Sequence, residues 1–154
     1  MKKILFAFLL TFAIGSIALP PLTAQAASKD TVQANKQLVE SFWNEVFNKH
    51  NVSIIDGTVG SNYTQHSPNF KDGKEAFYSA ISGFLKEFPK STAEIKNIVA
   101  EKDYVFIHNH IKLNPQDRGQ AAVDIFRVQD GKIVEHWDVI QDIPEKSENT
   151  NTMF

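Results

Sequence analysis

Residues 119–142 read GQAAVDIFRVQDGKIVEHWDVIQD, and this stretch decides the fold. Two runs of alternating apolar and polar residues, 120–129 and 132–142, flank the dipeptide Asp130-Gly131. An Asp-Gly pair tolerates the positive backbone angles that a two-residue hairpin turn requires. The stretch therefore predicts two antiparallel strands joined by a tight turn.

Asp124 is the residue of this hairpin that most needs an explanation. By alternation it lies on the same face as Ala122, Phe126 and Val128. A carboxylate on a largely apolar face costs free energy unless it is paired, protonated or used in chemistry. Asp124 is therefore the first candidate functional residue, and Phe126 beside it is a candidate ligand contact.

The residues before the hairpin predict helices. Apolar residues recur at spacings of three and four over residues 30–49, which is typical of an amphipathic helix. Residues 51–61 suggest a short helix or turn, and residues 61–73 a loop with a short extended start. Asp72 and Glu75 have the spacing of a capping box, which predicts a helix that ends before Pro89.

After Pro89 the pattern changes from helical to alternating. It predicts strands at residues 92–99 and 104–113, followed by the two strands of the hairpin. Short connections between these strands favour an antiparallel meander. Helices first and strands afterwards place the chain in the α+β class.

Two histidines share one strand before the hairpin. His108 and His110 lie two residues apart, so their side chains take the same face. Counting symmetrically from the turn at residues 114–119, we expect His110 to neighbour Asp124 within a residue or two of register. Such a pair could exchange a proton. The alternative is that both histidines are ordinary residues of a half-exposed sheet face.

A metal site is the rival interpretation of the same residues. His108, His110 and Asp124, with His66 as a fourth ligand, could be assembled around zinc or iron. No HExxH pattern or cysteine pair accompanies them. The prediction we adopt contains no metal.

The first 26 residues predict a secretory signal peptide. They comprise a basic start, an apolar run over residues 4–19 and the small-x-small pattern Ala24-Gln25-Ala26. The apolar run is shorter than a membrane-spanning helix requires, and Pro20-Pro21 interrupts it. We therefore expect export to the periplasm or the medium, with cleavage after Ala26 and no membrane contact afterwards.

The mature chain is expected to contain one domain at residues 27–143 and a polar tail at residues 144–154. Met153-Phe154 at the end of this tail is either a frayed terminus or a segment that docks onto the domain or onto a partner subunit.

Composition excludes several functions. Without Lys2 and Lys3 the 16 basic residues become 14 against 18 acidic ones, which argues against nucleic acid and anionic membranes as partners. The chain has no cysteine, so disulfides and a thiol nucleophile are excluded. No GxSxG elbow, phosphate-binding glycine loop or dinucleotide fingerprint occurs.

Residues 36–142 resemble the SnoaL-like polyketide cyclases of the nuclear transport factor 2 superfamily. The resemblance rests on the DxFRxxxGKIxEHWD run that begins at Asp124, on the HxH strand before it, and on the YxxHxP loop that contains Tyr63 and His66. It implies a cone-shaped α+β barrel, cystatin-like or nuclear transport factor 2-like. In such a barrel the N-terminal helices close an apolar pocket inside a curved antiparallel sheet. It also implies a homodimer formed through the outer sheet face.

The resemblance further implies site residues and a reaction. In the cyclases an Asp at the position of Asp124 is the general acid/base of an aldol closure that uses no cofactor. A His at the position of His110 lines the same pocket. His108 takes the place of another polar pocket group, and Tyr63, His66 and Trp137 are expected as further substrate-binding residues.

The expected function is an exported, cofactor-independent acid/base enzyme of the aldol, cyclase or isomerase type. Its substrate would be a small apolar or carbonyl-containing compound, with Asp124 as base or acid and His110 as its polar partner, which could donate to the developing enolate. The alternatives are a protein of the same fold that only binds a small ligand and, third, a metal-dependent enzyme.

Overall fold

The structure, a computed structural model, describes residues 28–154. The expected signal peptide at residues 1–26 lies outside the described residues. Among residues 28–154, no helix is long and apolar enough to cross a membrane.

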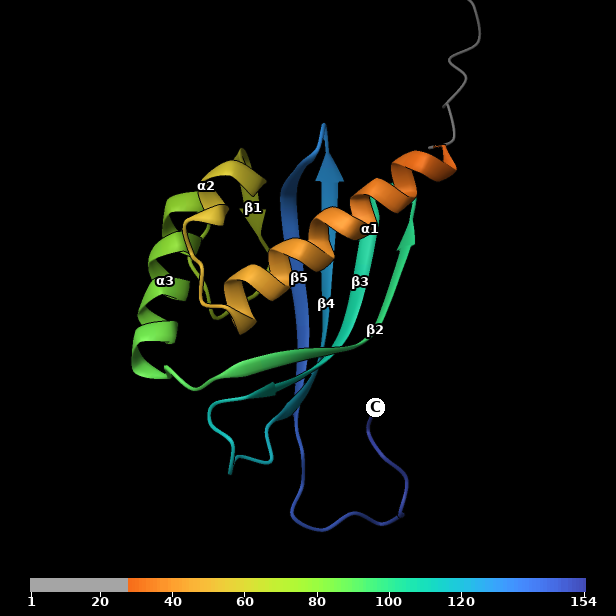
Figure 1. Ribbon diagram of the computed structural model, residues 1–154. Helices are drawn as coiled ribbons and strands as arrows, with labels where there is room; N and C mark the ends of the chain where they lie inside the picture. Colours follow the sequence, from red (N-terminus) through yellow and green to blue (C-terminus); the bar gives the residue numbers. More distant parts are fainter. Residues whose placement is uncertain (1–27) are drawn as a thin grey trace, which may run out of the picture.

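Three α-helices and a short π-helix precede most of the sheet. Helix α1 (Lys29–Trp43) begins at Ser28, whose Oγ accepts the backbone N–H of Thr31 at 3.1 Å, and it continues into the π-helix η1 (Asn44–Asn48). Helices α2 (Ile54–Thr58) and α3 (Lys74–Glu87) follow. Figure 1 shows α1 lying across the sheet, with α2 and α3 grouped at the β1 side.

The predicted capping box at α3 is wrong. The N-cap residue is Gly73, which has a φ of 94° and supplies no side-chain cap. The carboxylate of Asp72 instead accepts the backbone N–H of Gln65 at 2.7 Å. Asp72 therefore ties the end of the first strand to the start of α3.

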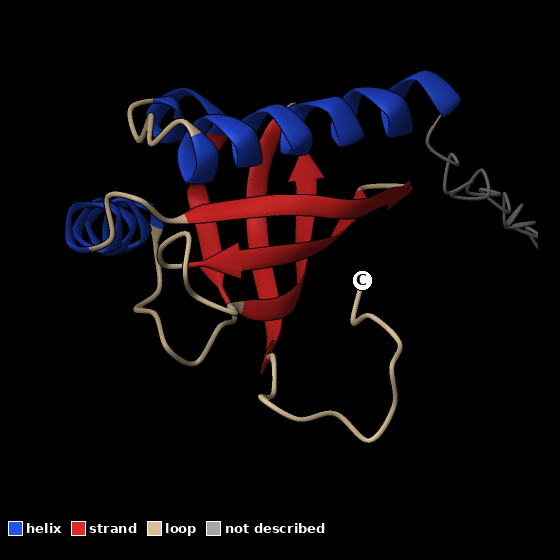
Figure 2. Cartoon of the chain, turned by 60° about the horizontal axis from the view of Figure 1, so that its bottom comes forward, coloured by secondary structure: helices blue, strands red, loops and turns tan. Residues whose placement is uncertain are grey.

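The sheet has five strands in the order β1-β5-β4-β3-β2. They are β1 (Val59–Gln65), β2 (Thr92–Glu101), β3 (Tyr104–Lys112), β4 (Gln120–Gln129) and β5 (Lys132–Asp142). The predicted meander from β2 to β5 is confirmed, and the curved sheet and the helices over it form the expected α+β cone (Figure 2). The sheet is mixed rather than antiparallel throughout, because β1 pairs with β5 in parallel.

The hairpin between β4 and β5 contains a β-bulge that the alternation of its sequence does not predict. Asp130 and Gly131 have φ angles of 51° and 70°, which confirms the predicted turn. The register then shifts between Arg127 and Val128. Because a shift of one residue exchanges the two faces of a strand, this bulge decides which β5 side chains point inward.

The core lies between the inner sheet face and the helices. The rings of Phe42 and Trp43 meet Phe126 edge-on, with centroids 6.0 and 6.1 Å apart. The indole N–H of Trp43 donates to the carbonyl of Ala93 at 2.8 Å, so α1 is tied to β2 as well as packed on it.

The C-terminal residue Phe154 docks onto the outer face of the sheet. Its ring stacks on His110 with centroids 4.6 Å apart, and the ring of His108 lies at 5.4 Å. Lys96 Nζ lies 5.4 Å from the centroid of the same ring. Of the two expectations for this end, the structure supports docking on the domain.

Candidate functional site

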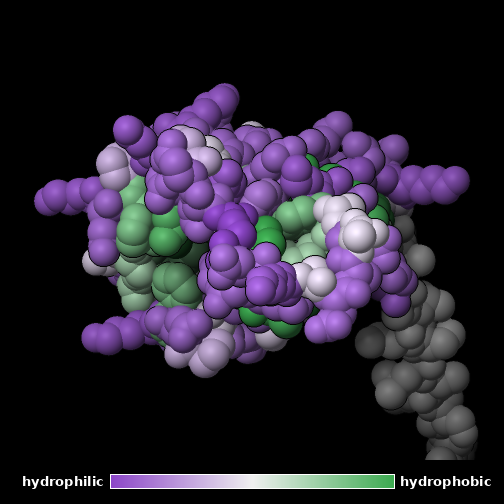
Figure 3. All heavy atoms as spheres, turned by 90° about the horizontal axis from the view of Figure 1, so that it is seen from below, coloured by the Kyte–Doolittle hydropathy of each residue, from purple (hydrophilic) through white to green (hydrophobic). Residues whose placement is uncertain are grey.

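An apolar cavity of about 150 Å³ lies between the inner sheet face, α1, η1 and α3. Aromatic side chains form much of its wall: Trp43, Phe47, Phe70, Phe77 and Phe84. Viewed from below, the molecule shows hydrophobic residues recessed within a hydrophilic rim (Figure 3). The expected apolar pocket is therefore present, and it is small.

Three ionisable side chains converge on this cavity from neighbouring strands. Asp124 of β4 and His136 and Asp138 of β5 all line it. Asp124 and His136 are only 5% and 6% exposed, and His136 Nε2 lies 2.9 Å from Asp124 Oδ1. The other carboxylate oxygen of Asp124 accepts an amide N–H of Asn109 at 2.6 Å. Asp124 is thus a buried, paired carboxylate, as its position on an apolar face requires.

The hydrogen bonds around His136 determine where its protons are. The side-chain oxygen of Gln65 accepts the backbone N–H of Ser67 at 2.9 Å, which identifies that atom as the amide oxygen. His136 Nδ1 lies 3.0 Å from the same oxygen and must therefore be the protonated donor. His136 consequently presents Nε2 to Asp124, and one proton lies between the two groups, on either the imidazole or the carboxylate.

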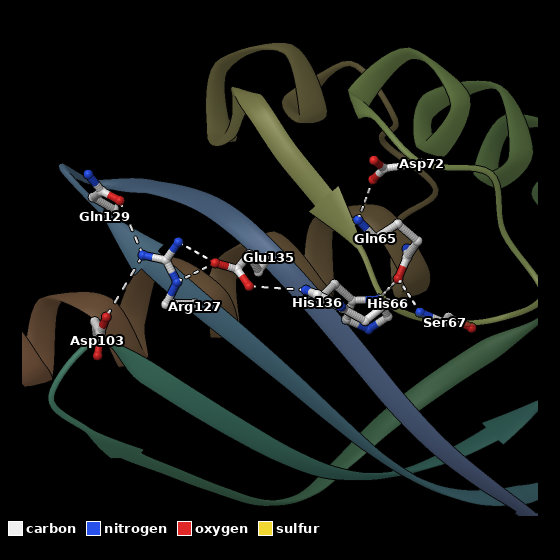
Figure 4. A network of polar contacts seen from close by, with 9 residues as sticks. All are labelled: Gln65, His66, Ser67, Asp72, Asp103, Arg127, Gln129, Glu135 and His136. Carbon is white, nitrogen blue, oxygen red and sulfur yellow. Dashed lines mark hydrogen bonds and ion pairs between the residues drawn. The ribbon is translucent and has the colours of Figure 1, made fainter.

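Gln65 is itself held from its other end. Its amide NH₂ donates to the hydroxyl oxygen of Tyr63 at 2.9 Å. Burial raises the pKa of Tyr63 well above its ordinary value, and the charges of Asp138, Asp72 and Asp124 raise it further, so this hydroxyl stays protonated. Figure 4 shows the side chain of Gln65 between Ser67 and His136.

The predicted partnership of His110 with Asp124 is wrong. In the observed register His110 pairs with Ala121 and His108 with Val123, whereas Asp124 pairs with Ile107. Paired residues share a face, so both histidines lie on the outer side of the sheet, opposite to Asp124. His110 Nε2 is instead 2.7 Å from the carbonyl oxygen of Arg118.

Two further predicted ligand contacts, His66 and Trp137, also lie on the outer face. Their rings stack on each other with centroids 4.2 Å apart, and His66 Nε2 is 3.0 Å from a carboxylate oxygen of Glu135. An unbulged hairpin would pair residue 124 with residue 137 and turn Trp137 inward. The bulge pairs Asp124 with Asp138 instead, so His136 faces inward and Trp137 outward.

The remaining predicted contacts are buried on the inner side. The ring of Phe126 stacks on His136 with centroids 4.7 Å apart. Tyr63 packs on Phe77 at 5.3 Å and reaches His136 through Gln65. Phe126 and Tyr63 therefore hold the side chains of the site in position, and neither residue lines the cavity.

Sequence reasoning missed His136 and Asp138. The EHWD run offered them as polar residues on alternate positions of β5, but only knowledge of the bulge would have selected their face. It also missed Gln65, whose role appears only once β1 is placed beside β5.

Among the described residues, the three ionisable side chains at the cavity are also the group that could hold a metal ion. Asp124, His136 and Asp138 each offer one ligand atom, and these atoms lie within 4.8 Å of one another. Because His136 Nδ1 lies against Gln65 Oε1, Nε2 is the ring nitrogen that would face an ion, beside the Asp124 oxygen 2.9 Å away. The alternative metal set of His108, His110 and His66 with Asp124 is wrong, because the three histidines lie on the opposite face of the sheet from Asp124.

Comparison with known proteins gives one family. The family model described as SnoaL-like polyketide cyclase matches residues 37–146. No match is found among curated proteins.

Solved structures share the fold. A polyketide cyclase candidate from Bacillus cereus ATCC 10987 is 24% identical, with a TM-score of 0.63 over 74% of this chain and 78% of that one. A SnoaL-like protein from Burkholderia thailandensis E264 is 21% identical, with a TM-score of 0.61 over 71% and 96% of the two chains. An isomerase candidate of the SnoaL-like family from Agrobacterium tumefaciens C58 is 9% identical, with a TM-score of 0.60 over 71% and 98%. At these identities the likeness concerns the fold alone.

Proposed function

Because the chain belongs to the SnoaL-like polyketide cyclase family, we propose that it is a cofactor-independent acid/base enzyme that acts on a small carbonyl compound. Asp124 and His136 are its catalytic pair, and His136 takes the role first expected of His110. The observation that carries this proposal is the contact of 2.9 Å between His136 Nε2 and Asp124 Oδ1 at the wall of an apolar cavity.

The pair suits proton transfer next to a carbonyl group. In the ionised state Asp124 is a carboxylate and His136 an imidazolium. As the C–H bond next to the carbonyl breaks, Asp124 takes the proton, and the electron pair forms the carbon–carbon double bond. The carbonyl oxygen takes the proton of His136 Nε2, so an enol forms and the pair becomes neutral. An apolar site strengthens both transfers, because its walls offer few groups that compete for the donors and acceptors.

Hydrogen exchange tests this proposal without knowledge of the natural substrate. The methyl protons of acetophenone in deuterium oxide should exchange faster with the protein than without it, because enol formation is reversible. Asp124→Asn should reduce the protein-dependent rate by about 100-fold or more, as expected for loss of a general base. His110→Ala is the matched control on the opposite face and should leave the rate unchanged. Equal rates for Asp124→Asn and the wild type would refute the role of Asp124.

A binding protein of the same fold is the alternative function. It is favoured by the same apolar cavity, which can hold a ligand whether or not a reaction follows. This alternative predicts ligand bound to the purified protein, no exchange with any carbonyl probe, and an effect of Asp124→Asn on affinity alone. The third alternative is a metal-dependent enzyme. Elemental analysis of untagged protein tests it, and the finding of no stoichiometric metal would exclude this alternative.

We propose in addition that the protein is exported and forms a homodimer. The pattern of residues 1–26 supports export. Exposed apolar side chains on the outer sheet face support self-association, since Val99, Val123 and Val139 are 62%, 37% and 70% exposed. Sedimentation of the mature chain and of Val139→Glu would test the dimer. A monomer in both would exclude it.

A further inference from the structure

We infer that the ligand of this cavity carries a positively charged amino group that binds the carboxylate of Asp138. Together with the proposed function, this makes the substrate a small amino ketone. The carbonyl group rests on that proposed function, whereas the positive charge rests on the composition of the cavity wall.

The wall of the cavity carries a negative charge that no basic side chain balances. Among the described residues that line it, only Asp124, His136 and Asp138 are ionisable, and none is a lysine or an arginine. Asp124 and His136 share one proton, so the two side chains together are neutral. An aspartate carboxylate is ordinarily ionised at neutral pH. Asp138 therefore leaves the wall with one negative charge.

Asp138 lies directly opposite Asp124 on the neighbouring strand. The two residues pair in the register of β4 and β5, so both side chains take the inner face of the sheet. Like charges directly opposite each other destabilise a sheet. His136 compensates Asp124 at 2.9 Å, whereas none of the ion pairs among residues 28–154 includes Asp138. The fold thus keeps a carboxylate here at a cost that a positive ligand would offset.

The charge of Asp138 acts on the buried part of the site. Asp138 is half-buried. Burial is the main cause of the raised pKa of Tyr63, and the charge of Asp138 is the next largest cause. Charges that are partly removed from water interact more strongly than charges on an open surface. An ammonium group beside Asp138 would therefore gain more than one in an exposed ion pair.

The aromatic part of the wall favours the same kind of ligand. The rings of Trp43, Phe47, Phe70, Phe77 and Phe84 line the cavity. The face of an aromatic ring is electron-rich and attracts a cation within about 6 Å, while it also packs against apolar groups. A small amine with an apolar body matches both the rings and the unbalanced carboxylate. An anionic ligand would match neither.

The amino and carbonyl groups of the ligand would lie close to each other. One oxygen of Asp138, one oxygen of Asp124 and a ring nitrogen of His136 lie within 4.8 Å of one another. An ammonium group bound to Asp138 is therefore only a few bonds from a carbon that faces Asp124. Its positive charge would also stabilise the enolate character that develops as that carbon loses its proton.

Binding of three probes with one skeleton tests the charge of the ligand. Ligand-observed NMR with the mature chain at pH 7 would compare 3-phenylpropylamine, 3-phenylpropan-1-ol and 3-phenylpropionate, which are positive, neutral and negative. We expect the amine to bind about threefold to tenfold more tightly than the alcohol, and the carboxylate to bind most weakly. Added salt should reduce this preference, because it screens charges. Equal binding of the amine and the alcohol, or no binding of the amine, would overturn the inference.

Two variants locate the charge that causes the preference. Asp138→Asn should abolish the preference for the amine and leave the binding of the alcohol unchanged. Asp142→Asn is the matched control, since it removes the same charge from the same face of β5 at a residue that does not line the cavity. Persistence of the preference in Asp138→Asn, or its loss in Asp142→Asn, would refute the role of Asp138.

The stability of Asp138→Asn provides a second measurement. The variant removes the like charge opposite Asp124, so it should unfold at the same urea concentration as the wild type or at a higher one. A clear loss of stability would show that a group within the protein already compensates Asp138. That result would also overturn the inference.

A metal ion is the other positive occupant that the charge of the wall could attract. Asp124, His136 and Asp138 are placed to hold one. A bound ion would reverse the charge that the ligand meets, so 3-phenylpropionate would then bind best until a chelator removes the ion. Such a result would overturn the inferred amine.

These results remain distinct from those for the proposed function. A preference for the amine without hydrogen exchange of acetophenone would refute the catalytic proposal and keep the inferred charge of the ligand. Hydrogen exchange without a preference for the amine would refute the inferred charge and keep the catalytic proposal.

Discussion

His136 Nε2 lies 2.9 Å from Asp124 Oδ1, on the inner face of the sheet, while His110 lies on the outer one. Two adjacent strands therefore bring a buried base and its proton partner together through their register alone. On either side of this pair, Asn109 donates to the other carboxylate oxygen of Asp124, and Gln65 Oε1 lies against the other ring nitrogen of His136. Each member restricts the orientation of the next, which is the preorganisation that proton transfer requires.

The first prediction concerns the stability of Asp124 variants. In Asp124→Asn the new amide can donate to His136 Nε2 and accept from Asn109, so we expect a loss of about 1 kcal/mol or less in the free energy of unfolding. Asp124→Ala leaves both partners buried and unpaired, and we expect a loss of about 3 kcal/mol. Urea denaturation of both variants measures this. Equal losses would mean that Asn does not rebuild the contacts.

The second prediction concerns the docked C-terminus. Deletion of Met153 and Phe154 removes the ring that stacks on His110 and lies beside His108. We expect the ring-proton signals of both histidines to shift in NMR spectra and the free energy of unfolding to fall by about 1 kcal/mol. Lys146→Ala, a change in the exposed tail, is the control. Unchanged histidine signals would show that the end does not dock in solution.

The third prediction concerns Gly119, at the turn between β3 and β4. Its φ is 82°, and a Cβ there would lie 2.1 Å from the backbone oxygen of Ile111. Gly119→Ala should lower the free energy of unfolding by about 3 kcal/mol, because the backbone itself would have to move. Gly57→Ala is the control, since nothing lies within 4 Å of a Cβ at that site and Gly57 is helical. A thermal melt of Gly119→Ala that matches the wild type would contradict the argument.

The fourth prediction concerns the acid side of the stability curve. Burial raises the pKa of Glu135, but hydrogen bonds from Arg127 and His66 outweigh it, so the pKa lies below the ordinary 4.5. A lowered carboxylate pKa adds stability above 4.5, and this contribution is lost as the pH falls through the folded-state value.

Glu135→Gln tests the direction of this pH dependence. The variant should be less stable than the wild type by about 1 kcal/mol at pH 7, and the difference should shrink as the pH falls below 4.5. Denaturant unfolding at several pH values measures it. A difference that does not shrink as the pH is lowered through the acid range would assign the effect to packing rather than to charge.

The parts of the fold that local sequence determines could be predicted. The strands at residues 120–129 and 132–142 have the predicted bounds, because alternation and the Asp130-Gly131 turn are encoded in neighbouring residues. The first helix also follows its apolar spacing, although its last five residues are π-helical. The parallel pairing of β1 with β5 joins segments far apart in the chain and had no local signal.

The site depended on register, which local sequence does not determine. Asp124 was identified correctly as a buried carboxylate that needs a partner, because that argument requires only its own strand. Its partner lies on another strand, where a slip of one residue exchanges the two faces. His110 pairs with Ala121 and therefore faces outward, whereas the bulge near Arg127 turns His136 inward. The partner of Asp124 is thus His136 and not His110.

The most direct test of this account is the protonation of the His136 ring. A nitrogen–proton correlation spectrum of the mature chain with ¹⁵N-labelled histidine distinguishes the two ring nitrogens. We predict a proton on Nδ1 of His136 in the folded protein, because Gln65 Oε1 can only accept. Gln65→Met, which lacks that acceptor, should lose this fixed preference. A neutral His136 that carries its proton on Nε2 in the wild type would contradict the account.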